Sequence, residues 1–470
     1  MRLPLLVTLC LLAGCSQLLP PAPDQTLALR RCGVANVAEP VWCGGLNVPE
    51  NRAAPPIARR YLSLNVVVIP AAGEKKLPPL YDLAGGPGVP ATHAAKFWAT
   101  DGAIHRQHRD VVLVDQRGTG ASAPLRCDVA LADPLVPVLE LQAVQLCRMQ
   151  LGAGADLAQY STAAAVADLE AVRAALGHER IDLHALSYGT RVAQEYLRAH
   201  PQRVRAMALL GTLSPAAKMP AHYSASAEAV LRKLADQCAA DKACRKAIPS
   251  LMDDVAALQQ EFAKGPVVVT RADGSKVDLQ PGRFWEAVRA QLGTAATQRR
   301  LPWLLHEAAA GRFEPLLAAT APQPDRHSNG ALLAVSCPED TLHVTTEEIA
   351  AARKTVFGDY RLQQQIATCN VWGVPRVERR PGPVRADVPV LLLAGDMDHV
   401  TPAELAREVA AHLPHARVVM VPALGHFPDG LTHMECYDKV INDFFVAGSA
   451  TALDLACLAT MQPPAFTTQG

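Results

Sequence analysis

Apolar runs alternate with helix-like segments over two separate parts of the chain. The segment 163–176 has helical spacing, with Val166, Leu169 and Val172 on one face. Alternation of strands and helices at this spacing predicts an α/β fold with a doubly wound, mostly parallel sheet. The predicted strands are the apolar runs at 61–70, 79–83, 110–114, 181–186 and 205–210, followed much later by 389–394 and 416–421.

The stretch between these two parts has a different pattern. From residue 214 to residue 385 the chain is largely helical, as at 227–234 and 252–262. The strand pattern resumes at Val388 and is followed by a closing helix. Because the sheet begins before this stretch and ends after it, we predict an inserted helical lid rather than a separate domain.

The N-terminus has the features of an export signal. Met1-Arg2 supplies a positive start, and residues 3–12 form an apolar run that is too short to span a bilayer. The run ends in Leu-Ala-Gly-Cys at 12–15, which resembles a bacterial lipobox and implies cleavage before Cys15 and lipidation of its thiol. The alternative is an ordinary signal peptide with a chance cysteine. In a Gram-negative cell, Ser16 would imply the periplasmic face of the outer membrane.

Length, composition and charge restrict the domain organisation and the kinds of partner that can be expected. With 470 residues, half of them hydrophobic, the chain suffices for one large domain with an insertion. Lys+Arg and Asp+Glu both number 45, so no nucleic-acid partner is expected, and membrane attachment is expected through the lipid anchor only. The expected organisation is a signal peptide at 1–14, a lipidated N-terminus and tether at 15–31, the first part of the core at 32–213, the lid at 214–385 and the second part of the core at 386–470.

Cysteine usage agrees with export. Two of the twelve cysteines, Cys10 and Cys15, lie in the signal region, and an even number remains. An even number in an exported chain predicts disulfides, although spacing alone leaves the connectivity open. There is no Cys-x-x-Cys and no zinc-like Cys/His cluster, so a metal site is not expected. The simplest pairing joins neighbours along the chain: Cys32 with Cys43, Cys127 with Cys147, Cys238 with Cys244, Cys337 with Cys369, and Cys436 with Cys457.

Ser187 is the candidate nucleophile. It lies in ALSYG at 185–189, between a predicted strand and a predicted helix. A nucleophile elbow occupies this place, because its sharp turn lifts the serine hydroxyl above the carboxyl edge of the sheet. The usual pattern is Gly-x-Ser-x-Gly, and Ala185 replaces the first glycine. The alternative is a simple strand-to-helix turn with an N-cap serine.

A serine hydroxyl needs a base, and the base needs an orienting carboxylate. Asp398 follows one late predicted strand and His426 follows the last. The chain order serine, acid, histidine is the order of this arrangement in α/β-hydrolases.

Other residues compete for both roles. Asp396 is an alternative acid, but Asp398 matches the pattern Gly-x-x-Asp-x-x-Thr-Pro at 395–402. His399 would sit beside its own acid, and His184 lies inside a predicted strand, where a core histidine is expected.

The sequence also predicts an oxyanion hole. Charge that develops on a carbonyl oxygen requires preorganised N–H donors. The residue after the nucleophile, Tyr188, supplies one, and the glycine-rich loop AGGPG at 84–88 supplies the other, with Gly86 as the expected donor. Taken alone, the loop is typical of a simple Gly/Pro turn.

Together these motifs resemble the prolyl aminopeptidase and tripeptidyl aminopeptidase branch of the α/β-hydrolases. The matching segments are AGGPG at 84–88, DQRGTGAS at 115–122 and ALSYG at 185–189. Ala84 stands where the branch has a histidine, which weakens the case for a strict prolyl preference. The resemblance implies an α/β-hydrolase fold and release of a residue or short peptide from a free N-terminus.

The resemblance also suggests where the substrate amine binds. CPED at 337–340 is similar to a lid cysteine followed by acidic residues, which makes Glu339 and Asp340 candidates to pair with the ammonium. Two solvated acids at a helix start are the alternative. Trp285, Trp303 and Trp372 are candidate pocket residues, with lid core as the simpler role.

The expected activity is therefore acyl-enzyme hydrolysis of a small peptide, without metal or organic cofactor. One alternative is an esterase or amidase on small acyl substrates, because the same triad serves esters and amides. The other is a non-catalytic lipoprotein that uses this fold as a binding surface.

Overall fold

The structure is a computed structural model that describes residues 26–127, 140–270, 274–320, 328–379, 382–428 and 430–469. The predicted signal peptide and Cys15 lie outside the described residues. Within the described ranges, no helix combines the length and apolarity that crossing a membrane requires.

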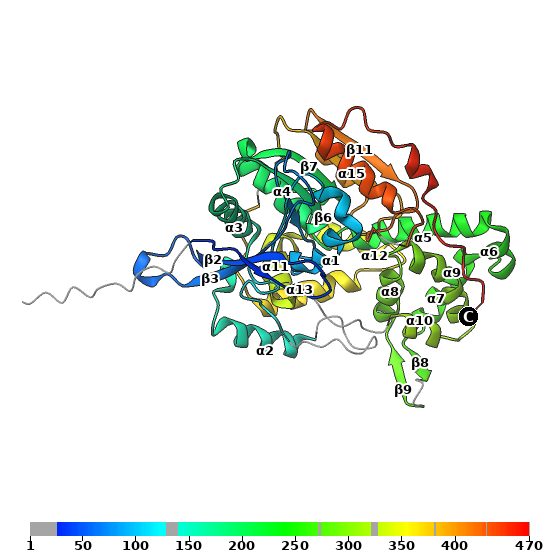
Figure 1. Cartoon of the computed structure of the whole chain (residues 1–470). Helices are drawn as coiled ribbons and strands as arrows, with labels where there is room; N and C mark the ends of the chain where they lie inside the picture. Colours follow the sequence, from blue (N-terminus) through cyan, green and yellow to red (C-terminus); the bar gives the residue numbers. More distant parts are fainter. Residues whose placement is uncertain are drawn as a thin grey trace, which may run out of the picture.

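The described residues form a nine-stranded, mostly parallel sheet in the order β1-β2-β3-β5-β4-β6-β7-β10-β11 (Figure 1). The strands from β5 onward in this order pair in parallel, whereas β1, β2 and β3 add an antiparallel edge. The predicted fold class is confirmed. The strands are β1 (Arg30–Cys32), β2 (Val41–Pro49), β3 (Tyr61–Ile69), β4 (Leu80–Leu83), β5 (Val111–Val114), β6 (Ile181–Leu186), β7 (Val204–Leu210), β10 (Val390–Gly395) and β11 (Ala416–Val421).

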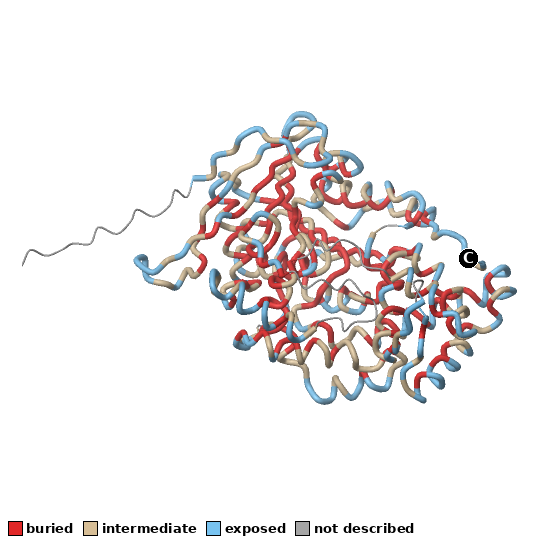
Figure 2. Tube along the Cα trace, turned by 90° about the horizontal axis from the view of Figure 1, so that it is seen from below, coloured by how far each residue is buried: buried red, intermediate tan, exposed pale blue. Residues whose placement is uncertain are grey.

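Helices cover both faces of the sheet (Figure 1), and the buried residues lie inside the molecule with the exposed ones at its outside (Figure 2), which explains the apolar composition of the strands. Every residue of β5 and of β10 is buried, as expected for parallel strands between two helical layers. One face packs against α3 (Thr162–Ala175), α4 (Tyr188–Ala199) and α14 (Ala403–Ala410). The other packs against α1 (Ala95–Ala99) and α15 (Glu435–Ala447).

The segment between β7 and β10 is mainly helical, and it includes a hairpin that the sequence analysis did not predict. Part of it has an apolar core of its own, whereas α11 and α13 bury residues in the core of the sheet. Trp285 lies in the first of these cores and Trp372 in the second, and Trp303 packs against the first. The elements are α5 (Tyr223–Ala240), α6 (Lys242–Ala247), α7 (Leu251–Ala263), β8 (Val267–Thr270), β9 (Lys276–Leu279), α8 (Pro281–Ala290), α9 (Ala295–Ala309), α10 (Glu314–Ala319), α11 (Asn329–Glu339), α12 (Thr346–Arg353) and α13 (Tyr360–Trp372).

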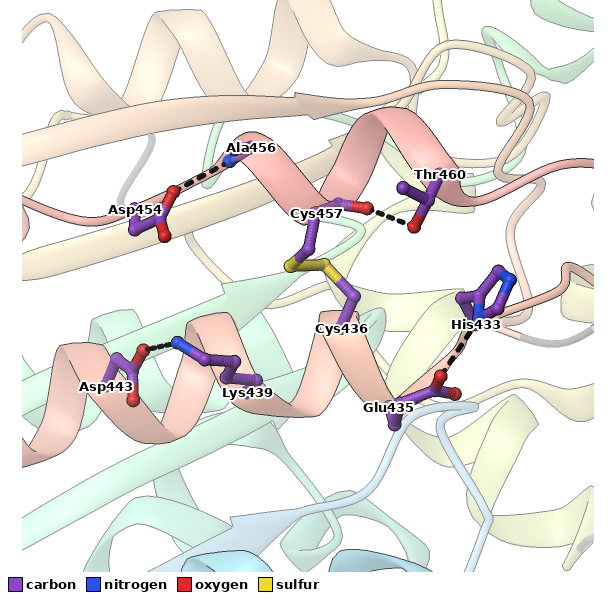
Figure 3. The surroundings of a disulfide bond; sticks show 9 residues. All are labelled: His433, Glu435, Cys436, Lys439, Asp443, Asp454, Ala456, Cys457 and Thr460. Carbon is purple, nitrogen blue, oxygen red and sulfur yellow. Dashed lines mark hydrogen bonds and ion pairs between the residues drawn. A yellow bond between two sulfur atoms is a disulfide. The ribbon is translucent and has the colours of Figure 1, made fainter.

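Five disulfides join neighbouring cysteines in the described chain. Four of them are Cys32–Cys43 between β1 and β2, Cys127–Cys147 at α2 (Leu141–Gly152), Cys238–Cys244 between α5 and α6, and Cys337–Cys369 between α11 and α13. Figure 3 shows the fifth, Cys436–Cys457, which ties the start of α15 to the short helix η7 (Ala456–Thr460). Because disulfides persist in oxidising compartments, this set indicates a protein that is exported.

Removal of the Cys337–Cys369 disulfide should destabilise the protein more than removal of Cys238–Cys244. The bridges span 32 and 6 residues respectively. Loop-closure entropy predicts about 3.7 kcal/mol for the longer loop and about 2.2 kcal/mol for the shorter one. Urea unfolding of the two Cys→Ala double variants, which both remove buried cysteines, measures the difference. Equal losses would contradict an entropic origin.

Candidate active site

Ser187 lies at the sharp turn between β6 and α4. Its backbone has φ 56° and ψ −124°, a left-handed conformation that a non-glycine residue adopts at a cost. The turn also requires Gly189, because a Cβ there would lie 2.1 Å from the Leu83 carbonyl oxygen of β4. Ala185 is fully buried inside β6, so its methyl group is accommodated where the usual pattern has glycine. The local structure therefore has the geometry of a nucleophile elbow.

His426 contacts Ser187 from the loop after β11. The distance from His426 Nε2 to Ser187 Oγ is 3.1 Å. The segment between β7 and β10 holds this loop, because the Gly293 carbonyl between α8 and α9 accepts the Phe427 N–H at 3.1 Å. The same carbonyl lies 2.6 Å from where a Cβ of Gly425 would stand, so a larger residue cannot precede His426 without a shift.

Asp398 lies on the other side of the histidine ring. Its two carboxylate oxygens are 3.1 and 3.0 Å from His426 Nδ1. Burial alone would raise the pKa of Asp398, but the charge and hydrogen bond of His426 and the hydrogen bonds of Thr401 together lower it well below its usual value. The buried carboxylate therefore stays ionised at neutral pH, as an orienting acid must.

Thr401 was not predicted as part of the site. Its hydroxyl donates to Asp398 Oδ2 at 2.6 Å and lies 3.1 Å from His426 Nδ1. Its backbone N–H and that of Val400 donate to Asp398 Oδ1. The motif Gly-x-x-Asp-x-x-Thr-Pro contains this threonine, but only the folded loop reveals that it holds both the acid and the base.

The competing residues have other partners. His399 Nε2 lies 3.2 Å from Arg289 of α8, and burial together with the Arg289 charge lowers the pKa of His399 to about 3. His184 contacts Asp82 through Nδ1 at 2.7 Å within the sheet. Burial raises the pKa of Asp396, whose main-chain carbonyl accepts a hydrogen bond from Lys233. None of these contacts reaches Ser187.

The residues predicted for the oxyanion hole flank Ser187. A Cβ on Gly85 would lie 3.0 Å from the Ser187 Cβ, so the glycine-rich loop touches the nucleophile. Gly86 in this loop has φ 106°, which favours glycine. Tyr188 is the first residue of α4, and N–H groups in a first helical turn have no partner within the helix. The positive end of the α4 helix dipole also lies at this N-terminus, next to Ser187.

The structure does not bring Glu339 and Asp340 to Ser187. Glu339 accepts two hydrogen bonds from Thr162, whose hydroxyl also bonds the Tyr188 hydroxyl. Asp340 is fully buried, with Arg191 bonded to both of its oxygens at 2.9 and 2.8 Å and Arg379 at 2.9 Å. These contacts tie the end of α11 to α3 and α4, so neither carboxylate is placed to receive a substrate amine at the nucleophile.

A serine, a histidine and an aspartate joined by hydrogen bonds at the carboxyl edge of a mostly parallel sheet define a hydrolase with this architecture. The chain belongs to the α/β hydrolase fold family, whose sequence model matches residues 78–428. The protein is accordingly a hydrolase.

Two relatives are named as peptidases. Serine protease Hip1 of Mycobacterium tuberculosis is 25% identical, in an alignment that covers 88% of this chain and 87% of the relative. Tripeptidyl aminopeptidase of Streptomyces lividans is 24% identical over 91% of this chain and 86% of the relative. Among solved structures, proline iminopeptidase of Mycobacterium smegmatis matches with a TM-score of 0.39 and 19% identity, covering 86% of this chain and 98% of that one.

The substitution Thr401→Val should lower kcat by about tenfold or more. It removes a hydrogen bond to a charged group, worth about 1.5–3 kcal/mol, while the bulk of the side chain is kept. Hydrolysis of p-nitrophenyl acetate measures the effect, and Thr401→Ser should restore most of the rate. A valine variant with unchanged kcat would contradict the role of this hydroxyl.

Proposed function

We propose that the protein is a serine aminopeptidase that releases a residue or short peptide from the free N-terminus of small peptides. The observation that carries this proposal is the chain of hydrogen bonds from Ser187 through His426 to Asp398. The names of the two relatives support a peptide bond, rather than an ester, as the natural target.

In the proposed mechanism, His426 Nε2 accepts the Ser187 proton as Oγ attacks the scissile carbonyl. Asp398 holds the ring in place and stabilises its charged form. The backbone N–H groups of Gly86 and Tyr188 bind the oxyanion of the tetrahedral intermediate. His426 then protonates the leaving amine, and a water molecule, deprotonated by His426, hydrolyses the acyl-enzyme to regenerate Ser187.

We also propose that residues 214–385 act as a lid over this site. Two contacts support this role, from the Gly293 carbonyl to the histidine loop and from Arg289 to His399 beside Asp398. Movement of this segment would change the surroundings of both the base and the acid. It is therefore suited to select which substrates reach the nucleophile.

Activity should require Ser187 and a free substrate amine. Ser187→Ala should abolish turnover and labelling by a fluorophosphonate probe, because no other group provides the nucleophile. Wild-type protein should cleave peptide anilides with a free amine and spare their N-acetylated forms. Equal rates on free and acetylated peptides would instead favour an esterase or amidase, and absence of labelling a binding protein.

We further propose that the mature chain begins at a lipidated Cys15. The lipobox-like segment at 12–15 and the disulfides of the folded part support export followed by anchoring. Metabolic labelling with radioactive palmitate in a bacterial host should mark the wild-type protein and not Cys15→Ala. A label that persists in the variant would contradict the anchor, and Cys10→Ala provides the matched control.

A further inference from the structure

A cavity of about 690 Å³ lies next to the glycine-rich loop. Its wall includes Ala84 and Gly85 of that loop and Leu186, the residue before the nucleophile. A Cβ on Gly85 would stand 3.6 Å from Ser187 Oγ, and Pro428 of the wall follows His426 by two residues. The cavity therefore borders the loop and the strand end that flank Ser187, and its volume is in the range of about 300–1,000 Å³ typical of small-ligand sites.

The remaining wall is mostly apolar, with acidic groups and the histidines His93 and His184 set into it. Val89, Pro90 and Phe97 contribute from the segment before and within α1, and Met434 and Tyr437 from the start of α15. No lysine or arginine of the described parts of the chain lines the cavity. Four acidic residues do: Asp82, Asp101, Glu435 and Asp438. A site with this lining suits a ligand that carries both apolar groups and a positive charge.

Asp438 is the acid in this wall that is best placed to bind a cation. Asp82 is already engaged, since it accepts from Trp98 Nε1 at 3.0 Å and contacts His184 at 2.7 Å. The Asp438 side chain is 18% exposed, and its carboxylate makes a long contact of 3.6 Å with His105 Nε2. Burial lowers the pKa of His105, so this ring is uncharged at neutral pH and does not neutralise Asp438.

The helix that carries Asp438 is held in place. Figure 3 shows the Cys436–Cys457 disulfide, which anchors the start of α15 two residues before Asp438. The nearby cation, Lys439, forms an ion pair with Asp443 on the same helix. The carboxylate is thus presented on a fixed wall, which reduces the entropic cost of binding a ligand.

We propose that this cavity receives the N-terminal end of the peptide substrate and that the Asp438 carboxylate binds its α-ammonium group. This inference rests on the proposed aminopeptidase function and names the group that would recognise the amine. Binding of the substrate ammonium is thereby assigned to a residue of α15, because Glu339 and Asp340 are held in other contacts. Side chains of the substrate would pack against the apolar wall while the carbonyl to be cleaved faces Ser187.

The test compares Asp438→Asn with wild type on alanine-based peptide anilides with a free or an acetylated amine. The ratio of the two kcat/KM values should fall by about tenfold or more in the variant, because a partly buried carboxylate no longer pairs with the ammonium. Asp454→Asn, which removes the same charge from an exposed position after this helix and leaves the Lys439–Asp443 pair intact, should keep the wild-type ratio. The rate on p-nitrophenyl acetate reports how much intact site each preparation contains.

Product inhibition provides a second measurement. Trialanine should inhibit ester hydrolysis by wild type far better than N-acetyl-trialanine does, and this difference should disappear in Asp438→Asn. If wild type hydrolyses the ester but does not distinguish the free amine, the aminopeptidase function itself fails. If wild type makes the distinction and Asp438→Asn keeps it, the assignment of Asp438 is wrong while the function stands.

Discussion

The hydrogen bond between His426 and Ser187 joins residues 239 positions apart, and the rest of the fold serves to make it possible. β7 and β10 pair directly in parallel, with Leu210 opposite Leu393, so their carboxyl ends lie side by side at one edge of the sheet although a long segment separates them in the chain. β11 then places the histidine loop next to this edge. The parallel register thereby brings the nucleophile, the acid and the base together, although each lies on a different loop.

Burial of charged side chains opposes folding, and several buried aspartates besides Asp398 lie in this structure. A buried aspartate is stabilised only where good partners replace its water, and loss of one partner typically costs about 3–5 kcal/mol. Three further buried aspartates meet this condition, because each lies between two arginines: Asp168 between Arg52 and Arg117, Asp182 between Arg109 and Arg205, and Asp340 between Arg191 and Arg379. The pair of Asp340 with Arg191 joins the end of α11 to α4, the helix that follows Ser187, whereas the pairs of Asp182 join β6 to β7 and to the residues before β5.

The sequence predicted most of the central sheet but not its edge. Buried parallel strands such as β5 and β10 have uninterrupted apolar runs, so their pattern is easily recognised. β2 contains Gly44 and Gly45 and has many partly exposed residues, and the β8–β9 hairpin is short and largely exposed, so neither has a comparable pattern. Ser187, Asp398 and His426 could be predicted to lie together because each follows a predicted strand, in the chain order serine, acid, histidine.

The binding residues could not be predicted in this way. Glu339 has an acidic side chain near a lid cysteine, but its partner Thr162 is 177 residues away and only the fold reveals it. The cavity beside Ser187 has walls from the loop after β4, from α1, from the strand ends and from α15. A local sequence motif cannot reveal such a surface, because its residues come from distant parts of the chain.

Two histidine–aspartate pairs near the elbow show that residue type alone does not define a base. His184 contacts Asp82 at 2.7 Å, at least as closely as His426 contacts Asp398. His184 extends from the interior of β6, whereas His426 follows the end of β11 and reaches the serine hydroxyl. Asp82 also accepts from Trp98 and belongs to the wall of the cavity, so this pair shapes the space beside the nucleophile. The same two side chains therefore form part of a wall when they lie within the sheet and a proton-transfer pair when they lie at its edge.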